Sequence, residues 1–251
     1  PRSEAEVATA VRQAKLDGLA ISICGGRHSM GGQQFGEATV LLDLTGMDGV
    51  GEVDRVKGTV EAAAGIKWPE LIEALHARQA GDDPMWSIRQ KQTGADDLTL
   101  GGALAANIHG RGLRMKPIIA DVEAFTLVNA DGEVLRCTRT ENAEWFRLAI
   151  GGYGCFGVIT SVCLRLSRRV KLERRVEIIT VDRFLPMIEQ RIEERALYGD
   201  FQFSIDEHSP DFLKRGVFSC YLPVAEDQPM PESRNELDAD DWRELISLAH
   251  R

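Results

Sequence analysis

The glycine-rich stretch SICGGRHSMGGQQF, residues 22–35, is the first part of the chain whose residue types point to chemistry. Its glycines tolerate positive φ angles and leave backbone N–H groups able to converge on an anion. An imidazole, His28, and a hydroxyl, Ser29, stand at its centre. A loop of this kind between two strands can hold a pyrophosphate without a lysine. A glycine-rich hairpin with a surface histidine is the alternative, and the loop alone favours neither.

A second cluster of small residues, LTLGGALAANIHGRG, covers residues 98–112 and again contains one histidine, His109. The run from Gly101 to Ala106 has almost no side-chain bulk, as is expected where a flat, rigid group lies against the backbone. Two such loops, each with one histidine, are difficult to explain as unrelated turns. Together they favour a bound ligand over the hairpin alternative.

The glycines Gly152, Gly154 and Gly157 spell GxGxxG, a dinucleotide-binding fingerprint when it follows a strand and opens a helix. Here a helical pattern precedes the glycines and a β-rich run follows them, which is the reverse order. We therefore interpret them as a tight turn that lets backbone approach a ligand, and we exclude a Rossmann fold. The chain also lacks the GxxxxGKS/T pattern of a P-loop.

The elements that must position these loops mix helices with β-hairpins, so the expected fold class is α+β rather than a doubly wound sheet. Residues 3–18 have the Ser3 cap and the apolar spacing of an amphipathic helix. Residues 120–138 contain two β-rich runs joined through NADGE, which predicts a hairpin. Strands are also expected at 19–23, 39–44, 58–66, 158–167 and 174–184, helices at 67–79, 141–150, 184–197 and from 240 onward, and an acidic loop at 225–241.

Composition and charge restrict the class of protein. The 251 residues are 43% hydrophobic and 27% charged, which is ordinary for a globular protein with a sizeable core. A net charge of −9 argues against nucleic acid as a partner, and no apolar run is long enough for a membrane span. The five cysteines form no CxxC motif, which favours reduced thiols and a cytoplasmic location.

Taken together, GGRHSMGGQ, TLGGALAANIHGRG and IGGYGCFGVI resemble the FAD-binding oxidoreductases of the vanillyl-alcohol oxidase and p-cresol methylhydroxylase (PCMH) type. Within that superfamily the chain looks closest to the sugar- and alditol-oxidising branches, which include the oxidase subunit of decaprenylphosphoryl-ribose epimerase and the aldonolactone oxidases. The resemblance implies FAD-binding subdomains at 1–52 and 53–168, followed by the start of an α+β substrate (cap) domain at 169–251. Because members of the family are usually much longer, it also implies a truncated chain.

The resemblance also assigns cofactor-binding residues, most of which would act through backbone groups or small side chains. The first loop would wrap the FAD pyrophosphate, and the second would line the phosphates, the ribityl chain and the isoalloxazine edge. The backbone at 157–159 would meet the adenine end, and no metal ligands are implied. The full set is Cys24, Gly25, Gly26, Arg27, His28, Ser29, Met30, Gly31, Gly32, Gly94, Thr99, Leu100, Gly101, Gly102, Ala106, Asn107, His109, Gly157, Val158 and Ile159.

Two histidines in this set carry chemical hypotheses. In several branches of the superfamily, such as cytokinin dehydrogenases, a histidine followed by serine in this loop is bonded covalently to the flavin 8α-methyl group. The resemblance places His28 at that position, although this chain has RHS where those proteins have GHS. A plain hydrogen-bonding residue beside the phosphates is the alternative. His109 is the candidate catalytic residue, and a buried histidine that only orients its loop is the alternative there.

The function that the resemblance implies is FAD-dependent oxidation of a hydroxyl-bearing, sugar-like or alditol-like small molecule. A hydride would pass from the C–H beside the hydroxyl to flavin N5, and oxygen or another acceptor would take the electrons onward. The catalytic base is expected beyond residue 251. Two alternatives stay open, namely a nicotinamide-dependent flavin reductase of the same superfamily and a flavin-binding module without turnover.

Overall fold

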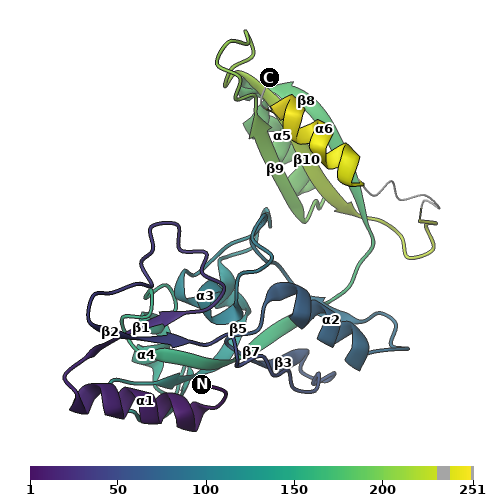
Figure 1. The fold of residues 1–251 in the computed structure, drawn as a ribbon. Helices are drawn as coiled ribbons and strands as arrows, with labels where there is room; N and C mark the ends of the chain where they lie inside the picture. Colours follow the sequence, from purple (N-terminus) through teal and green to yellow (C-terminus); the bar gives the residue numbers. More distant parts are fainter. Residues whose placement is uncertain (231–237, 250–251) are drawn as a thin grey trace.

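Three separate β-sheets organise residues 1–230 and 238–249, the part of the chain that the computed structural model describes. Figure 1 shows two of the sheets with helices α1 to α4 in a lower unit, and the third in an upper unit joined to it by the chain that follows β7. The fold is α+β, as the sequence predicts. Within the described ranges, no helix has the length and apolar character needed to cross a bilayer.

The first sheet pairs β1 (Ala20–Cys24) with β2 (Thr39–Asp43) in parallel. Parallel pairing requires the chain to return to the end of the sheet where the first strand began before the second strand can start. Residues 25–38 therefore form a crossover connection between the two strands. This geometry rules out the glycine-rich hairpin that the sequence left open.

Helix α1 (Glu4–Leu16) packs against both this small sheet and the central sheet. It begins as predicted at Ser3, whose hydroxyl accepts a hydrogen bond from the Glu6 amide at 3.2 Å. Its apolar face lies in one buried cluster with residues from β2 and from the central sheet. The members of that cluster are Val7, Ala8, Val11, Leu42, Leu44, Met47, Val128 and Val158.

The central sheet is antiparallel and has the strand order β3-β7-β5-β6, with β4 paired to β7 off that path. β5 and β6 form the predicted hairpin, in which Val128 pairs with Val134 across the NADGE turn. β7 pairs with β3, β4 and β5, and so lies in the middle of the sheet. The strands are β3 (Thr59–Ala63), β4 (Trp86–Ile88), β5 (Val122–Val128), β6 (Val134–Thr138) and β7 (Val158–Arg168).

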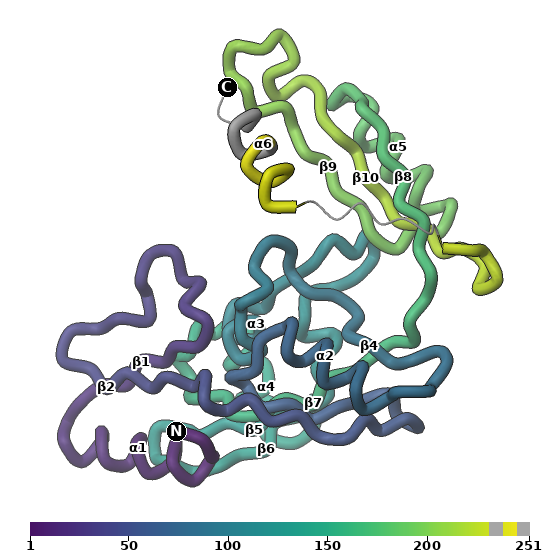
Figure 2. The backbone as a smooth tube through the Cα atoms, turned by 45° about the vertical axis from the view of Figure 1, so that its right-hand side comes forward, coloured from purple at the N-terminus to yellow at the C-terminus, as the bar shows by residue number. Residues whose placement is uncertain are grey.

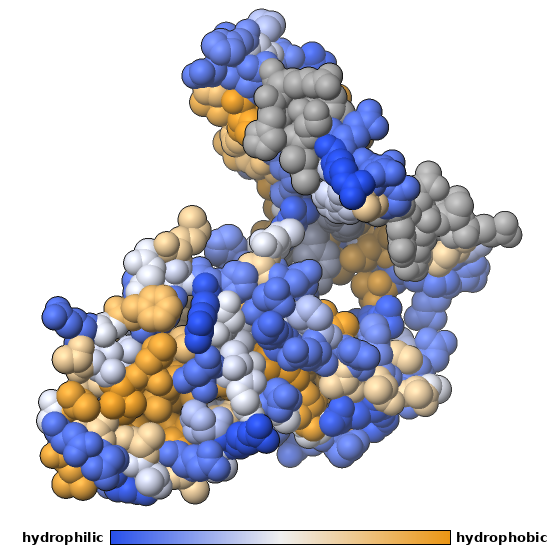
Figure 3. Space-filling view, viewed as in Figure 1, coloured by the Kyte–Doolittle hydropathy of each residue, from blue (hydrophilic) through white to orange (hydrophobic). Residues whose placement is uncertain are grey.

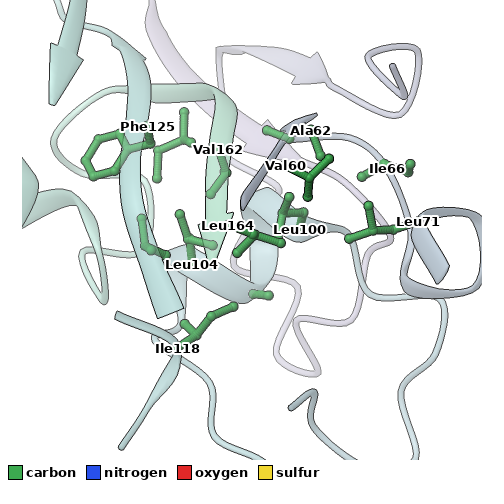
Figure 4. Packing of buried hydrophobic residues seen from close by; sticks show 14 of the residues in the cluster. Val60, Ala62, Ile66, Leu71, Leu100, Leu104, Ile118, Phe125, Val162 and Leu164 are labelled. Carbon is green, nitrogen blue, oxygen red and sulfur yellow. The ribbon is translucent and has the colours of Figure 1, made fainter. Parts of the chain in front are cut away.

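Three helices and one 3₁₀ turn fill the main core around this sheet. Figure 4 shows Leu100 and Leu104 of α3 lying among strand residues that include Val162 and Leu164. Each fully buried leucine contributes about 1.5–3 kcal/mol relative to an exposed one, so burial fixes α3 against the sheet. The elements are α2 (Trp68–Arg78), α3 (Leu100–Ala105), the 3₁₀ turn η1 (Ile118–Asp121) and α4 (Ala143–Ala149).

The third sheet is antiparallel with the order β8-β10-β9 and has its own small core. Figure 2 shows α5 (Val181–Glu193) on one side of this sheet, and α6 (Ala239–Ala249) follows near the end of the described chain. The strands are β8 (Leu172–Thr180), β9 (Tyr198–Phe203) and β10 (Arg215–Pro223). The buried cluster contains Ile179, Met187, Ala196, Phe218, Cys220 and Leu222. The domain boundaries drawn at 52/53 and 168/169 stay predictions.

The structure corrects the end of one predicted strand and the conformation of the second glycine cluster. The strand expected at 174–184 ends at Thr180, because helix α5 begins at the next residue. Asp182 stands in the first turn of α5, where a carboxylate is favoured by the helix dipole. Phe184 of the same helix packs against the core of the third sheet. The second glycine cluster, expected as a loop, contains α3, because the Thr99 hydroxyl caps its start and buried leucines hold it. The short strand β4 and the strands β9 and β10 were not predicted at all.

The C-terminal predictions fall partly outside the described residues. Residues 225–230 are exposed and contain a turn, in agreement with the acidic loop predicted at 225–241, of which 231–237 lie outside the description. Helix α6 agrees with the helix predicted from 240 onward, of which residues 250 and 251 lie outside it.

Gly157 is the glycine whose replacement should most clearly destabilise the central sheet. Its φ is +133°, and an added Cβ would lie 2.6 Å from the Val128 carbonyl oxygen. We expect Gly157→Ala to lower the free energy of unfolding by more than the roughly 1–3 kcal/mol of backbone strain alone. Gly81→Ala is the matched control, since Gly81 has φ +94° with open space around it. Urea unfolding measures both, and equal losses would contradict the steric argument.

Candidate functional site

The two glycine-rich segments meet in space, although they lie far apart in the sequence. A Cβ added to Gly25 would fall well inside van der Waals contact with the Thr99 hydroxyl, and one added to Gly26 would do the same with the Asp97 carbonyl. Only glycine permits this approach at either position. The structure therefore brings together the end of β1, the first loop and the start of α3.

The backbone of the first loop has unused donors. Among the described residues, the N–H groups of Gly26, Arg27, His28 and Ser29 donate to no protein acceptor. Gly32 is different, because its N–H donates to the Ser29 carbonyl at 3.1 Å. A short run of free N–H groups beside glycines is the arrangement that binds phosphate oxygens through backbone. The loop therefore fits the pyrophosphate of a dinucleotide.

Gln34 adds a second sign of a missing partner. Its side chain is 9% exposed. Within residues 1–230 and 238–249, its Oε1 atom has no hydrogen-bond donor. A buried amide oxygen without a donor is unfavourable by about 1–3 kcal/mol, so such an atom ordinarily faces a bound group or water. Sequence reasoning missed Gln34, because nothing in QQF separates it from Gln33.

Charged and thiol groups at the base of the loop are already satisfied. Arg27 has φ +57° and places Nη2 3.0 Å from Asp43 Oδ2. Hydrogen bonds from the Thr45 side chain and amide hold the pKa of Asp43 below its usual range, so Asp43 is ionised and fixes the arginine. Burial raises the pKa of the Cys24 thiol, which therefore stays protonated at neutral pH. These residues hold the loop and offer no nucleophile.

His28 lies at the place where the two loops meet. Its side chain is exposed. The imidazole ring lies close to Gly26, because a Cβ added to that glycine would be 3.2 Å from His28 Cδ2. No hydrogen bond to the imidazole occurs among the described residues. Met30 and Phe35 of the same loop are also exposed. Figure 3 shows apolar surface on this side of the molecule, over β1 and β2.

The first amides of α3 are bonded within the protein and are not free to bind a ligand. The amides of Leu100 and Gly101 donate to the carbonyls of Ile66 and Ala64 at 2.8 and 2.7 Å. The Gly102 amide donates to the Thr99 hydroxyl at 3.4 Å. These N–H groups are therefore occupied. Gly101 allows α3 to pack closely on Ala64, since an added Cβ would lie 3.0 Å from the Ala64 Cβ and carbonyl oxygen, and Leu100 is buried in the core.

The end of α3 is joined to the third glycine motif. Gly151 and Tyr153 donate backbone hydrogen bonds to Leu104 and Ala105 at 2.9 and 3.0 Å. A Cβ on Gly154 would lie 3.2 Å from Ile23 Cδ1 of β1. The motif follows α4 and precedes β7, the reverse of a Rossmann unit, as the sequence indicates. All three glycine motifs therefore surround one place in the fold.

Several of the residues predicted to bind the cofactor have contacts or exposure that the structure now shows. Asn107 has φ +46° and accepts a hydrogen bond from the Ile119 amide at 3.3 Å. His109 is exposed, with Nδ1 3.1 Å from the Gly110 carbonyl, so the buried-histidine alternative is wrong. Val158 and Ile159 have buried side chains within the sheet. Gly94 and Ala106 are exposed, and so are Ser29 and Gly31.

A cavity of about 280 Å³ lies where the third sheet faces the lower unit. One wall comes from the segment between β4 and α3 and from Arg111, and the other from the strands of the third sheet. Phenol, amide, hydroxyl and cationic groups line it, with one leucine. The lining residues are Gln90, Lys91, Gln92, Thr93, Arg111, Leu172, Tyr198 and Tyr221. Sequence reasoning identified none of them, since they share no motif.

Comparison with known proteins agrees with this geometry. The model of an FAD binding domain matches residues 1–138, more than half of the chain, and the chain belongs to this FAD-binding family. Mouse L-gulonolactone oxidase is 30% identical over 165 residues, which cover 66% of this chain and 36% of that enzyme. L-gulono-1,4-lactone dehydrogenase of Mycobacterium tuberculosis H37Rv is 28% identical over 232 residues, covering 92% and 50%.

Two further likenesses concern one more relative in sequence and one solved structure with a similar fold. Cytokinin dehydrogenase 9 of rice is 28% identical over 190 residues, covering 72% of this chain and 35% of that enzyme. A structure of alkyldihydroxyacetonephosphate synthase superposes with a TM-score of 0.74 at 20% identity, covering 89% of this chain and 46% of that one. The chain thus spans about a third to a half of the length of these relatives. The predicted FAD-linked oxidoreductase family is confirmed, and the decaprenylphosphoryl-ribose branch stays a prediction.

Gly26 offers a direct test of the contact between the loops. Gly26→Ala forces a methyl group against the Asp97 carbonyl. Overpacking of this kind ordinarily costs about 1–3 kcal/mol, and we expect this cost to appear as weaker FAD binding. Gly31→Ala is the control in the same loop, because its Cβ would meet only the mobile amide of Gln33 at 2.7 Å. Titration of FAD fluorescence measures both variants. Unchanged affinity in Gly26→Ala would show that the contact does not shape the site.

Proposed function

We propose that this protein binds FAD and oxidises the hydroxyl-bearing carbon of a small sugar-like or alditol-like molecule, with aldonolactones as close candidates. The observation that carries the proposal is the meeting of the glycine loops at Gly25, Gly26 and Thr99, which leaves a backbone cradle of phosphate-binding type. Membership of the FAD-binding family and the lactone-oxidising relatives support the same function. Oxygen or another acceptor would take the electrons.

The chain's own groups divide between cofactor and substrate. The N–H groups at 26–29 would donate to the pyrophosphate. The Gln34 Oε1 atom would instead accept from a hydroxyl or N–H group of the cofactor, and α3 would help to exclude water from the neighbouring space. Bound FAD supplies an acceptor for the hydride that leaves the substrate carbon. His109, two residues from the pocket residue Arg111, is our candidate for a group near the reacting atoms.

The cavity at the third sheet is our candidate substrate site. At about 280 Å³ it is slightly smaller than the usual small-molecule pocket of about 300–1,000 Å³. The Tyr221 and Thr93 side chains offer hydroxyl groups that suit a substrate with hydroxyls of its own. The Gln92 amide shapes the wall, because it already accepts from the Trp68 indole and donates to the Ala95 carbonyl. These features favour a compact polyol or lactone.

The substrate proposal has a spectroscopic test. We expect the purified protein to take up FAD, become yellow, and bleach without oxygen when an alditol or L-gulono-1,4-lactone is added. Bleaching by NADPH alone would identify a nicotinamide-dependent reductase instead. A yellow protein that none of these compounds reduces would identify a binding module, and a protein that takes up no FAD would overturn the proposal entirely.

We also propose that His28 is the point of covalent flavin attachment. The ring is exposed, has no hydrogen-bond partner among the described residues, and lies beside the two glycine loops. Attachment requires a neutral imidazole nitrogen to form a bond to the 8α-methyl carbon, which gives up a proton while the oxidised flavin accepts two electrons. An unpartnered imidazole in a loop of small residues can adopt the necessary orientation.

Acid precipitation decides between attachment and simple proximity. We expect wild-type flavin to stay in the acid pellet and to fluoresce on the protein band of a denaturing gel. His28→Ala should release FAD to the supernatant while the fold survives, because the cradle is made of backbone. His109→Ala, which removes another exposed imidazole, should leave the flavin in the pellet. Release of all wild-type flavin would show that His28 is only a neighbour of the cofactor.

A further inference from the structure

A short segment of the lower unit is hydrogen-bonded into the edge of the third sheet. Gly112 and Tyr198 form an isolated antiparallel bridge. The Leu113 amide donates to the Leu197 carbonyl at 2.9 Å, and the Gly199 amide donates to the Arg111 carbonyl at 3.0 Å. Because β9 is an edge strand of its sheet, the segment occupies backbone groups that would otherwise face solvent. Figure 2 shows the chain between α3 and β5 reaching toward the upper unit.

The side chain of Leu113 continues this contact into the core of the third sheet. It packs against the cluster that contains Phe218 and Met187. A Cβ on Gly199 would lie 3.2 Å from Leu113 Cδ2, so the glycine leaves room for the leucine. One unit therefore supplies a residue to the apolar core of the other.

Polar contacts stand on either side of the leucine. Arg111 Nη1 lies 3.3 Å from Asp200 Oδ1, an ion pair without the geometry of a hydrogen bond, and the Asp200 side chain is 18% exposed. The Tyr198 hydroxyl donates to the Arg89 carbonyl at 2.6 Å. Burial raises the pKa of Tyr198, so the phenol keeps the proton that it donates. Three consecutive residues of β9 thus contact the lower unit.

The segment 108–118 is also bonded to other parts of the lower unit. The Gly110 amide donates to Gln90 Oε1 at 3.2 Å, and Gln90 Nε2 donates to the Lys116 carbonyl at 2.6 Å. The Ile118 amide donates to the Ile108 carbonyl at 2.8 Å. A Cβ on Gly110 would lie 2.6 Å from the Lys91 carbonyl oxygen. The segment that contacts the third sheet is therefore also bonded into the lower unit, and its Arg111 lines the cavity.

We propose that Arg111, Gly112 and Leu113 form a latch between the two units, and that Asp200 is a positioning residue that acts on the flavin site through Arg111. Closing the latch fixes the backbone at 107–110, which carries His109 and follows directly on α3. The inference rests on the proposed FAD function, because the expected consequence is tighter FAD binding when the latch is closed. Coupling of this kind is a difference in free energy between two sites linked by one rigid segment.

Hydrogen exchange tests the latch without any cofactor. In the wild-type protein we expect the Leu113 and Gly199 amides to exchange more slowly than those of Arg27 and His28, which donate to no described acceptor. Leu113→Ala should speed exchange at Gly199. The control Ile188→Ala removes an apolar side chain from the same cluster, but from within the upper unit. Rapid exchange of both amides in the wild type would overturn the latch.

FAD titration tests the coupling. We expect Leu113→Ala to raise the Kd for FAD about tenfold, within the usual range for linked sites, while Ile188→Ala leaves it unchanged. Equal effects of the two variants would mean that the cluster matters only for stability. A wild-type protein that binds no FAD would overturn the proposed function and the coupling with it, whereas hydrogen exchange would still decide the latch.

Charge variants test the positioning role of Asp200. We expect Asp200→Asn to weaken FAD binding, and Asp211→Asn to leave it unchanged, since Asp211 pairs with Arg215 inside the upper unit. Arg111→Asp should also weaken binding, and combining it with Asp200→Arg should restore part of the affinity, as paired residues do in a double-mutant cycle. Strictly additive losses would show that the pair does not position the segment.

Discussion

The close approach of two backbone segments is the constraint on which the rest of this structure depends. Where Gly25 and Gly26 pass Thr99 and Asp97, no side chain fits between them, so the end of β1 and the start of α3 cannot move independently. α3 is held at its start by carbonyls of the β3–α2 turn and at its end by the turn at 151–153. A ligand that binds one of these segments therefore meets a frame built from all of them.

Local patterns predicted local structure well, and long-range contacts explain where they failed. The cap of α1 and the hairpin across NADGE depend on residues a few positions apart, so the sequence contains their signal. α3 has two glycines in six residues, a composition that disfavours a helix. It is helical because Leu100 and Leu104 are buried in a cluster whose other members lie far away in the chain, both before and after α3. The parallel pairing of β1 with β2 is equally invisible in the local sequence.

The candidate site likewise contains residues that the sequence could identify and residues that it could not. Glycine marks places where backbone must pass closely, so Gly25, Gly26 and Gly101 could be identified from sequence alone. The burial of Gln34 arises only when the crossover folds, and no spacing predicts it. The cavity takes Tyr198 and Tyr221 from strands that were not expected, and their position depends on a contact between separate units. Sequence thus locates a glycine loop of phosphate-binding type more readily than the wall of a cavity.

The parallel pairing of β1 and β2 has a consequence for how this fold can change during evolution. In an antiparallel hairpin, the length of the turn sets the strand register. In a parallel pair, the crossover can lengthen or shorten while the five partners from Ala20–Thr39 to Cys24–Asp43 stay opposite one another. Closing a longer loop also costs little additional entropy. The glycine-rich segment 25–38 is therefore free to gain, lose or exchange residues, and its binding properties can change without redesign of the strands beneath it.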